Sequence, residues 1–284
     1  MKERLTITLD TELLKKLDAT IDGVNVRNRS HAIERLLDIV LAQNKPKKAV
    51  VLAGGRPIKT ERNDEVPKPM VMVRDRPILE YVIRELKRNG ITDILIIIGR
   101  DGEKITRYFG DGTLFGIKIS YIKEDAPRGT ESALELAKGI VGDSPFFVIN
   151  GDNIFKINLL DMYDQHTKTH ATATIALATS DVPAHFGVSK LEGSRITSFE
   201  EKPETKQGSA LVSAGVYVFN PSVFNLVSVG SKPTMLEKSL LPKLAEAGRL
   251  DGYVFSTPWT PLETQNIKES IRRLETVAGR LSGS

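Results

Sequence analysis

The chain of 284 residues contains no cysteine. This absence excludes disulfides, thiolate zinc sites, iron–sulfur clusters and cysteine nucleophiles. The sequence also has no run of about 18 apolar residues, so we predict that it has no membrane-spanning segment and does not bind a membrane. Residues 1–4 (Met-Lys-Glu-Arg) lack the apolar stretch of a secretory signal. These absences together favour a cytoplasmic protein.

A large excess of charge is missing as well, because the formal net charge is only +4. Any binding to nucleic acid would therefore need a local basic surface. No internal repeat or low-complexity tract is present, which argues against a solenoid or a disordered chain. The chain is 40% hydrophobic and 27% charged. Its composition and length fit a small globular domain joined to a larger one.

The clearest boundary in the sequence is the polar and basic stretch at residues 43–48 (Gln-Asn-Lys-Pro-Lys-Lys). It follows an apolar helical run and precedes an apolar strand. We therefore predict a first domain at 1–44, a linker at 45–48 and a second domain at 49–277. The small and polar residues 278–284 are expected to form a flexible tail.

The first domain begins with a strict alternation of polar and apolar side chains at residues 4–9, which predicts a half-buried strand. A first helix is expected to begin at Asp10 or Thr11, and a second at Asn28 or Ser30. So short a unit cannot bury enough surface alone, and a single strand has unpaired edges. We therefore expect a two-fold homodimer, or a higher even oligomer, in which two such strands pair over four helices.

This strand–helix–helix pattern resembles the ribbon–helix–helix family of repressors, of the Arc and MetJ type, over residues 2 to about 43. The resemblance implies double-stranded DNA as a partner, with the paired strands in the major groove. Polar strand residues would contact bases, while the amides that open the second helix and nearby cations would contact phosphates. The residues implied are Lys2, Arg4, Thr6, Thr8, Arg27, Asn28, Arg29 and Ser30. The alternation alone equally allows a strand that only dimerises or binds a partner protein.

In the second domain, apolar strands at 49–53, 94–98 and 146–149 alternate with helical stretches at 77–89 and 131–138. This alternation predicts an α/β domain with a mainly parallel sheet. The later strands look antiparallel, so the whole sheet is expected to be mixed.

Short motifs follow one another along this domain. They are Leu-Ala-Gly-Gly at 52–55, Val-Pro-Lys-Pro-Met at 66–70, Arg-Pro-Ile-Leu-Glu-Tyr at 76–81, Pro-Arg-Gly-Thr-Glu at 127–131, Ile-Asn-Gly-Asp-Asn at 149–153, Phe-Gly-Val at 186–188, Phe-Glu-Glu-Lys-Pro at 199–203 and Ser-Ala-Gly-Val-Tyr-Val-Phe at 213–219. In this order they resemble the sugar-1-phosphate nucleotidylyltransferase family over about residues 48 to 275. The resemblance implies a Rossmann-like, GT-A-like fold. It also implies an enzyme that joins a nucleoside triphosphate to a sugar phosphate and releases pyrophosphate.

The resemblance further implies roles for individual residues, although each taken alone also has an ordinary structural explanation. The nucleotide would lie against Leu52, Ala53, Gly54, Gly55, Lys68, Gly129 and Thr130. The sugar phosphate would lie against Gly187, Glu201, Lys202 and Tyr217. Asp152 follows a buried strand, at the sheet edge where α/β proteins bind ligands, and would hold Mg²⁺.

Two departures from the family pattern weaken the expectation of catalysis. Residues 56–65 replace the family's glycine and its Thr-Arg-Leu run, and Pro57 removes a backbone donor. This loop also carries acidic residues beside the expected polyphosphate: Glu61, Asp64 and Glu65. Its candidate replacements for the missing arginine are Arg56, Lys59 and Arg62. The family's second metal-binding aspartate is absent after Trp259, with Glu263 out of register, and each such loss typically costs about 10²- to 10³-fold in rate.

We therefore predict a DNA-binding transcription regulator whose second domain binds a nucleotide, a sugar phosphate or a nucleotide sugar with weak or no catalysis. The alternative is an active Mg²⁺-dependent sugar-1-phosphate nucleotidylyltransferase with a regulatory or dimerising N-terminal module. A third hypothesis is a structural DNA-coating protein with the large domain as its oligomerisation body.

Overall fold

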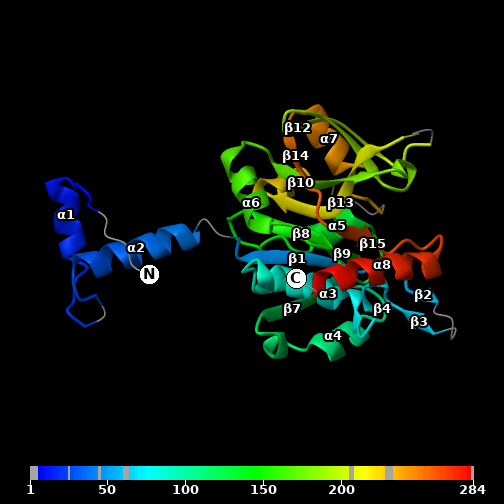
Figure 1. The fold of residues 1–284 in the computed structure, drawn as a ribbon, viewed down its shortest axis with the longest axis horizontal. Coiled ribbons are helices and arrows are strands. Elements are labelled where there is room, and N and C mark those ends of the chain that lie inside the picture. Colours follow the sequence, from blue (N-terminus) through cyan, green and yellow to red (C-terminus); the bar gives the residue numbers. More distant parts are fainter. Residues whose placement is uncertain are drawn as a thin grey trace. The chain divides into compact units, whose positions relative to one another are not determined.

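The computed structural model describes residues 6–24, 26–43, 46–59, 64–204, 208–227 and 233–282. The chain divides into two compact units, Met1–Lys45 and Pro46–Ser284 (Figure 1). Within the described residues, no helix combines the length and apolar character needed to cross a bilayer.

The small unit contains α1 (Thr11–Asp18) and α2 (Arg29–Gln43). Both helices begin where the capping residues predict. The Asp10 side chain accepts a hydrogen bond from the Leu13 N–H at 2.8 Å. The Asn28 side chain accepts one from the His31 N–H at 3.0 Å. Because these side chains satisfy amides that have no partner inside the helix, they set the two start points.

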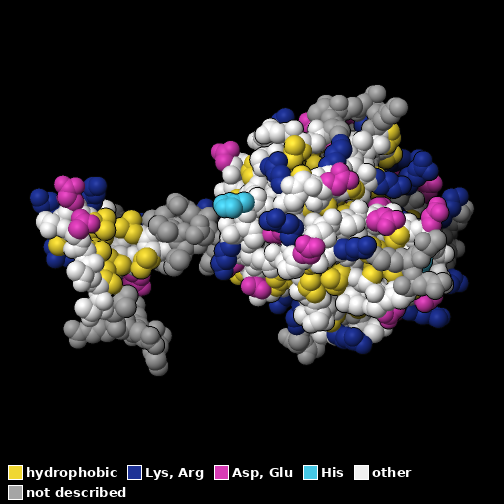
Figure 2. Space-filling view, turned by 90° about the horizontal axis from the view of Figure 1, so that it is seen from above, with side chains coloured by type: hydrophobic (Ala, Val, Ile, Leu, Met, Phe, Trp, Pro, Cys, Tyr) yellow, Lys and Arg dark blue, Asp and Glu magenta, His cyan; other side chains and the backbone are white. Residues whose placement is uncertain are grey.

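The small unit has a small core in the part whose side chains are described, residues 6–24 and 26–37. The buried side chains there are Leu17, Val26 and Ala32, with partly buried neighbours packed around them. Other large apolar side chains remain exposed: Ile7, Leu13, Val24, Leu36 and Leu37. Figure 2 shows a group of hydrophobic side chains on the face of the small unit turned to the viewer. The described part of this unit therefore leaves much of its apolar surface in contact with water.

The expected N-terminal ribbon is not seen. Residues 6–10 carry no strand, and Thr6 and Thr8 are exposed. An extended segment forms a strand only against a partner strand, and the described part of this unit offers none. The expected contacts of Lys2 and Arg4 lie outside the described residues. The Arg29 guanidinium donates two hydrogen bonds of 2.7 Å to the Asp18 carboxylate, so it is already engaged within the chain.

The large unit is built on a nine-stranded mixed sheet, in the order β10-β14-β12-β11-β13-β8-β1-β6-β7. The strands are β1 (Lys48–Ala53), β6 (Asp93–Ile98), β7 (Lys118–Lys123), β8 (Phe146–Asn150), β10 (Ala173–Ser180), β11 (Gly187–Glu192), β12 (Arg195–Glu201), β13 (Ala210–Phe219) and β14 (Leu250–Val254). Strand β1 pairs in parallel with both β6 and β8, and β6 pairs in parallel with β7. Strand β13 joins β8 antiparallel. The predicted mixed α/β sheet is confirmed, but the sheet is not mainly parallel, because four of its strand pairings are parallel and five are antiparallel.

Short strands and helices surround this sheet. The strands are β2 (Ile58–Lys59), β3 (Glu65–Val66), β4 (Met72–Val73), β5 (Arg76–Pro77), β9 (Asn153–Phe155) and β15 (Trp259–Pro261). The α-helices are α3 (Ile78–Arg88), α4 (Glu103–Phe109), α5 (Thr130–Glu135), α6 (Leu159–Lys168), α7 (Leu240–Glu246) and α8 (Ile267–Ser282). The 3₁₀ turns are η1 (Lys68–Met70), η2 (Thr113–Phe115), η3 (Pro183–His185) and η4 (Pro221–Asn225).

The central strands are apolar on both faces, because helices cover both. Val51 and Ile96 point into a cluster with α3, α4 and α6. Val50 and Ile97, one residue away, point into the opposite cluster with α5 and α7. Successive side chains of a strand alternate between faces, so continuous apolar runs are what such a sheet requires.

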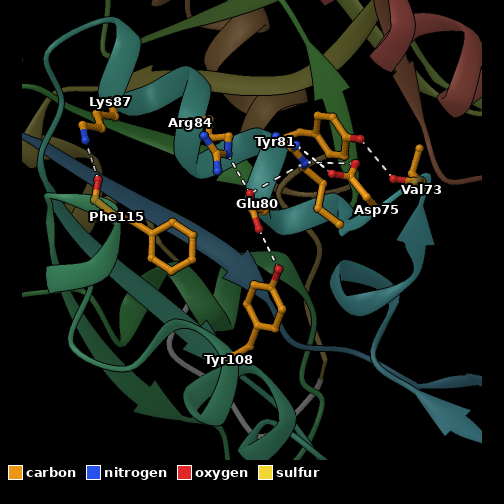
Figure 3. Close-up of polar contacts among 9 residues, drawn as sticks. Val73, Asp75, Glu80, Tyr81, Arg84, Lys87, Tyr108 and Phe115 are labelled. Carbon is orange, nitrogen blue, oxygen red and sulfur yellow. Dashed lines mark hydrogen bonds and ion pairs between the residues drawn. The ribbon is translucent and has the colours of Figure 1, made fainter. Parts of the chain in front are cut away.

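Helix α3 is tied to its neighbours by polar contacts as well as by apolar packing (Figure 3). The buried Glu80 carboxylate accepts hydrogen bonds of 2.7 Å from Arg84 and from the Tyr108 hydroxyl of α4. The Tyr81 hydroxyl donates to the Val73 carbonyl at 3.0 Å. This network links α3 to α4 and to β4.

The predicted flexible tail is wrong. Helix α8 continues through Ser282, and Ala278 is fully buried. It packs in a cluster with Leu274, Leu262 and Val73. The sequence pattern predicted a frayed end because these residues are small. In the structure, the small side chain of Ala278 lets α8 pack closely against its neighbours.

Candidate active site

A pocket of 590 Å³ opens at the carboxyl ends of the parallel strands. Leu52 and Gly54 reach it from the end of β1, Glu124 from the end of β7, and Asn150 and Asp152 from the end of β8. This is the edge at which α/β sheets bind ligands. The topology therefore brings together residues that are distant in the sequence, such as Leu52 and Asp152, which are 100 positions apart.

Most of the predicted ligand residues line this pocket. They are Leu52, Gly54, Gly55, Lys68, Gly129, Thr130, Asp152, Glu201 and Lys202. Ala53, Gly187 and Tyr217 do not line it, and these three assignments need correction. Ala53 points into the core beneath the sheet, because strand alternation turns it away from its neighbours Leu52 and Gly54.

The Gly54–Gly55 turn exposes bare backbone to the pocket. Gly55 has φ of 89°, a left-handed conformation that favours glycine. A methyl group on Gly54 would lie 2.2 Å from Glu124 Oε2, so this carboxylate packs directly on the Gly54 backbone. Glu124 is half-buried, and burial raises its pKa. Glu124 was not among the residues predicted from the sequence, although it follows the end of a strand as Asp152 does.

Asp152 and Lys68 are two charged side chains of the pocket lining that lie near each other. Burial raises the pKa of the Asp152 carboxyl, and the nearby Lys68 charge opposes that rise. Among the described residues, no cluster of three or more His, Cys, Asp or Glu side chains could hold a metal ion. Mg²⁺ needs only one or two protein carboxylates when nucleotide phosphates supply further ligands. One carboxylate that faces a pocket beside a lysine fits that mode of binding.

In the described part of the loop after Gly55, one cation faces the pocket and one acidic side chain is paired with an arginine. Arg56 lines the pocket. The Glu65 carboxylate accepts a hydrogen bond of 2.8 Å from Arg100, and its carbonyl accepts one from Lys104, so its charge is offset. Glu61 and Arg62 lie outside the described residues. Thus one of the three proposed replacement cations, Arg56, lines the pocket.

Glu263 also lies at the pocket wall, but its charge is already compensated. One oxygen lies 2.7 Å from His185 Nδ1, and the other lies 3.0 Å from an Arg273 nitrogen. A carboxylate held on both sides is a poor substitute for the missing metal-binding aspartate. Glu263 instead ties η3 to α8 across the edge of the pocket.

The other end of the pocket is acidic and contains Glu201 and Glu237. Burial and the neighbouring Glu237 carboxylate raise the pKa of Glu201. Glu237 accepts hydrogen bonds from the Thr130 hydroxyl at 2.9 Å and from the Tyr217 hydroxyl at 3.1 Å. Tyr217 is only 1% exposed, so its hydroxyl supports Glu237 from within the core and not from the pocket surface. Sequence reasoning missed Glu237.

Glycines shape this region through close packing. A methyl group on Gly187 would lie 2.3 Å from the Phe199 ring and 3.0 Å from Glu201 Oε2, so Gly187 supports Glu201 from outside the wall. Gly129 has φ of 89°, and its missing side chain makes room for the Thr234 carbonyl. Gly129 thus lines the pocket, whereas Gly187 supports its wall from outside.

The comparisons with known proteins concern mainly the large unit. Residues 48–261 match the family described as Nucleotidyl transferase. A low-salt glycan biosynthesis nucleotidyltransferase of Haloferax volcanii is 36% identical over 63% of this chain and 51% of its own length. A probable mannose-1-phosphate guanylyltransferase of Oryza sativa is 32% identical over 75% of this chain and 60% of its own length. The chain thus spans only about half to three-fifths of these two relatives.

Two further matches cover more of the related protein. The D-glycero-alpha-D-manno-heptose 1-phosphate guanylyltransferase of Aneurinibacillus thermoaerophilus is 31% identical over 69% of this chain and 86% of its own length. The crystal structure of a putative glucose-1-phosphate thymidylyltransferase from Bacillus anthracis, in complex with a sucrose, superposes with a TM-score of 0.72. It is 26% identical and covers 81% of this chain and 95% of its own.

These relatives correct the main functional prediction. All four are named as transferases, and none is named as a DNA-binding protein or a regulator. The predicted transcription regulator, with a ligand domain of weak or no catalysis, is therefore wrong, and the DNA-binding role assigned to the small unit is corrected with it. The relatives favour the alternative, an active enzyme. The prediction of DNA binding came from the strand–helix–helix pattern of residues 2–43, and that of weak or no catalysis came in part from the altered loop, whose Arg56 lines the pocket and whose Glu65 is paired with Arg100.

Proposed function

Because the chain belongs to the nucleotidyl transferase family, we propose that it transfers a nucleotidyl group from a nucleoside triphosphate to a sugar 1-phosphate. The second product is pyrophosphate. The relatives are named for guanylyl and for thymidylyl transfer, so their names leave the base open. Their sugars also differ, and we propose a hexose or heptose 1-phosphate as the acceptor class.

One observation carries this proposal: Asp152 and Lys68 share a pocket wall with the bare backbone of Gly54 and Gly55. Glycine amides let phosphate oxygens approach closely, and a lysine neutralises their charge. A carboxylate in the same wall would repel those phosphates unless a cation lay between them. The combination therefore fits a nucleoside triphosphate bound as its complex with a divalent metal ion.

In the proposed reaction, an oxygen of the sugar phosphate attacks the α-phosphorus of the nucleotide. The bond from that phosphorus to the oxygen bridging to the β-phosphorus breaks, and pyrophosphate leaves. Lys68 and Arg56 stabilise the negative charge spread over the phosphates. Mg²⁺, when bound through Asp152, would act as a Lewis acid on the α-phosphate.

The acidic end of the pocket would bind the sugar. Carboxylates accept hydrogen bonds from hydroxyl groups, and Glu201 and Glu237 offer several acceptor positions at the pocket surface. Thr130 and Tyr217 hold Glu237 in place. Lys202, next to Glu201, would pair with the phosphate of the sugar.

The test is release of pyrophosphate from each nucleoside triphosphate, with hexose and heptose 1-phosphates and Mg²⁺. We expect Asp152→Asn to lower the rate by at least about 10²-fold, since it removes the carboxylate that would hold the metal. Asp143→Asn is the matched control, because Asp143 is exposed and does not line the pocket. No pyrophosphate from any pair of substrates, or full activity of Asp152→Asn, would overturn the proposal.

A further inference from the structure

We infer that Arg273 of α8, which is not among the residues lining the pocket, is a positioning residue for the sugar phosphate. Through Glu263 and His185 it holds the η3 turn at the edge of the pocket. The η3 turn in its place then fixes the backbone of Lys202. The inference rests on the proposed function, in which Lys202 pairs with the phosphate of the sugar.

Lys202 adopts an uncommon backbone conformation. Its φ is 49°, in the left-handed region that favours glycine. This conformation is unfavourable for a residue with a side chain, so it persists only where surrounding contacts fix it. Strain of this kind is concentrated at functional sites, where a side chain must be presented in one direction. Because Lys202 lines the pocket, the contacts that hold its backbone bear on ligand binding.

The backbone of Lys202 is held by the residue that ends η3. The Lys202 N–H donates to the Phe186 carbonyl at 3.0 Å. Phe186 directly follows η3 and leads into β11, whose first residue, Gly187, pairs with Glu201 at the end of β12. A displacement of η3 would therefore reach Glu201 and Lys202 through the backbone.

The η3 turn depends on its neighbours for its position. It is a single 3₁₀ turn that begins with a proline and has no side-chain cap. So short a turn has little stability of its own. The Phe186 ring packs edge-on against the Trp259 ring, with centroids 5.4 Å apart. On the other side, His185 Nδ1 lies 2.7 Å from a Glu263 oxygen. This second contact is the one that reaches α8.

Glu263 can anchor η3 because α8 holds Glu263. Its other oxygen lies 3.0 Å from an Arg273 nitrogen, and its N–H donates to the buried Ser270 hydroxyl at 2.8 Å. The Glu263 side chain is only 14% exposed, so its charged contact to Arg273 is stronger than that of an ordinary surface pair. Both residues lie beyond 48–261, so the family match assigns them no role.

The test is steady-state kinetics of pyrophosphate release by the full chain, with mannose 1-phosphate and glucose 1-phosphate as the probes. We expect Arg273→Gln to raise the KM for the sugar 1-phosphate roughly 5- to 20-fold, and to leave kcat and the KM for the nucleoside triphosphate within about twofold. Arg273→Lys should recover most of the loss, because one nitrogen makes the contact to Glu263. Arg272→Gln, an exposed change at the preceding residue, is the matched control. An equal rise in both KM values would show a general structural effect and overturn the inference.

A double-mutant cycle tests whether Arg273 acts through Lys202. In a Lys202→Met background, Arg273→Gln should change the KM for the sugar 1-phosphate by less than about twofold, because the side chain that it positions is gone. A repeat of the full 5- to 20-fold rise in that background would contradict the inference. Glu263→Gln is a second variant, with nearly the same shape, and should reproduce the selective rise in case Arg273→Gln impairs folding.

Binding and turnover separate this inference from the proposed function. Calorimetric titration with the same two sugar phosphates, in the presence of Mg²⁺, measures binding directly. Binding that weakens in Arg273→Gln, without pyrophosphate release by the wild type, would sink the proposed function alone. Pyrophosphate release with a sugar KM that Arg273→Gln leaves unchanged would sink the inference alone. The absence of both binding and release would sink both.

Discussion

The two units of this chain differ most in how much apolar surface they bury. The small unit buries Leu17, Val26 and Ala32 and exposes several larger apolar side chains. The large unit has extended apolar clusters on both faces of its sheet. Burial is the main term that offsets the loss of chain entropy on folding. We therefore expect the large unit to be stable by itself. The small unit should gain more stability from a partner that covers its exposed apolar side chains.

The largest effect expected is in the core of the large unit. Leu86 of α3 is fully buried beneath the sheet. Leu86→Ala should lower the free energy of unfolding by about 2–5 kcal/mol, because it leaves a cavity. Leu17→Ala in the small unit is the matched comparison. Pyrophosphate release is measured as the denaturant concentration is increased. It should show that Leu86→Ala lowers the stability of the active domain and that Leu17→Ala does not. An equal loss from both changes would show that the units fold as one.

Acid should destabilise the large unit through His166. This side chain is 1% exposed, and burial lowers its pKa to about 4. In the unfolded state the pKa of this side chain is near 6.5. The free energy of unfolding therefore keeps the whole contribution of His166 above that pH and loses it as the pH falls toward 4. The decline attributable to this residue is about 3 kcal/mol. Thermal melts at intervals from pH 7 to pH 4 should show it, and His166→Gln should have a flatter profile. A wild-type profile that stays flat would contradict the shift.

The small unit should associate with a second copy through its exposed apolar face. Leu36 and Leu37 of α2 are 41% and 49% exposed. Burying a leucine side chain contributes about 1.5–3 kcal/mol, so Leu36→Glu should weaken a dimer by roughly 10- to 100-fold. Sedimentation velocity over a range of concentrations measures this. The exposed change Leu114→Glu in the large unit is the control. A wild-type chain that remains monomeric at every concentration would rule out the dimer.

The smallest effect expected is at the polar network on α3. Tyr108→Phe removes the 2.7 Å hydrogen bond to Glu80 but leaves Arg84 in place. We expect a loss of about 1 kcal/mol, confined to the large unit. Differential scanning calorimetry should place this change in the transition that Leu86→Ala also shifts. A loss as large as that of Leu86→Ala would mean that the network, and not apolar packing, carries the stability of α3.

Local signals in the sequence predicted local structure well. Asp10 and Asn28 begin helices because their side chains satisfy free amides within three residues. The central strands followed from short apolar runs, and the position of Asp152 followed from the end of one such run. These features depend on interactions that are close in the chain, so a single sequence contains the information for them.

Side-chain direction and partnership could not be predicted in the same way. Tyr217 resembles a ligand residue by motif, yet it supports Glu237 from within the core. Glu65 stands in the altered loop, yet it pairs with Arg100 from the end of another strand. Ala278 looks like part of a tail, yet it is buried. Each outcome depends on contacts between segments far apart in sequence.

By itself, the sequence determined the alternation of strands and helices, the helix start points and the order of motifs along a family-like domain. Contacts in the tertiary structure decided that Glu124 packs on Gly54 and that Glu263 lies against both His185 and Arg273. The physical reason is that helix caps and apolar periodicity act over a few residues. The charge balance of a pocket, in contrast, depends on which strand ends the sheet places side by side.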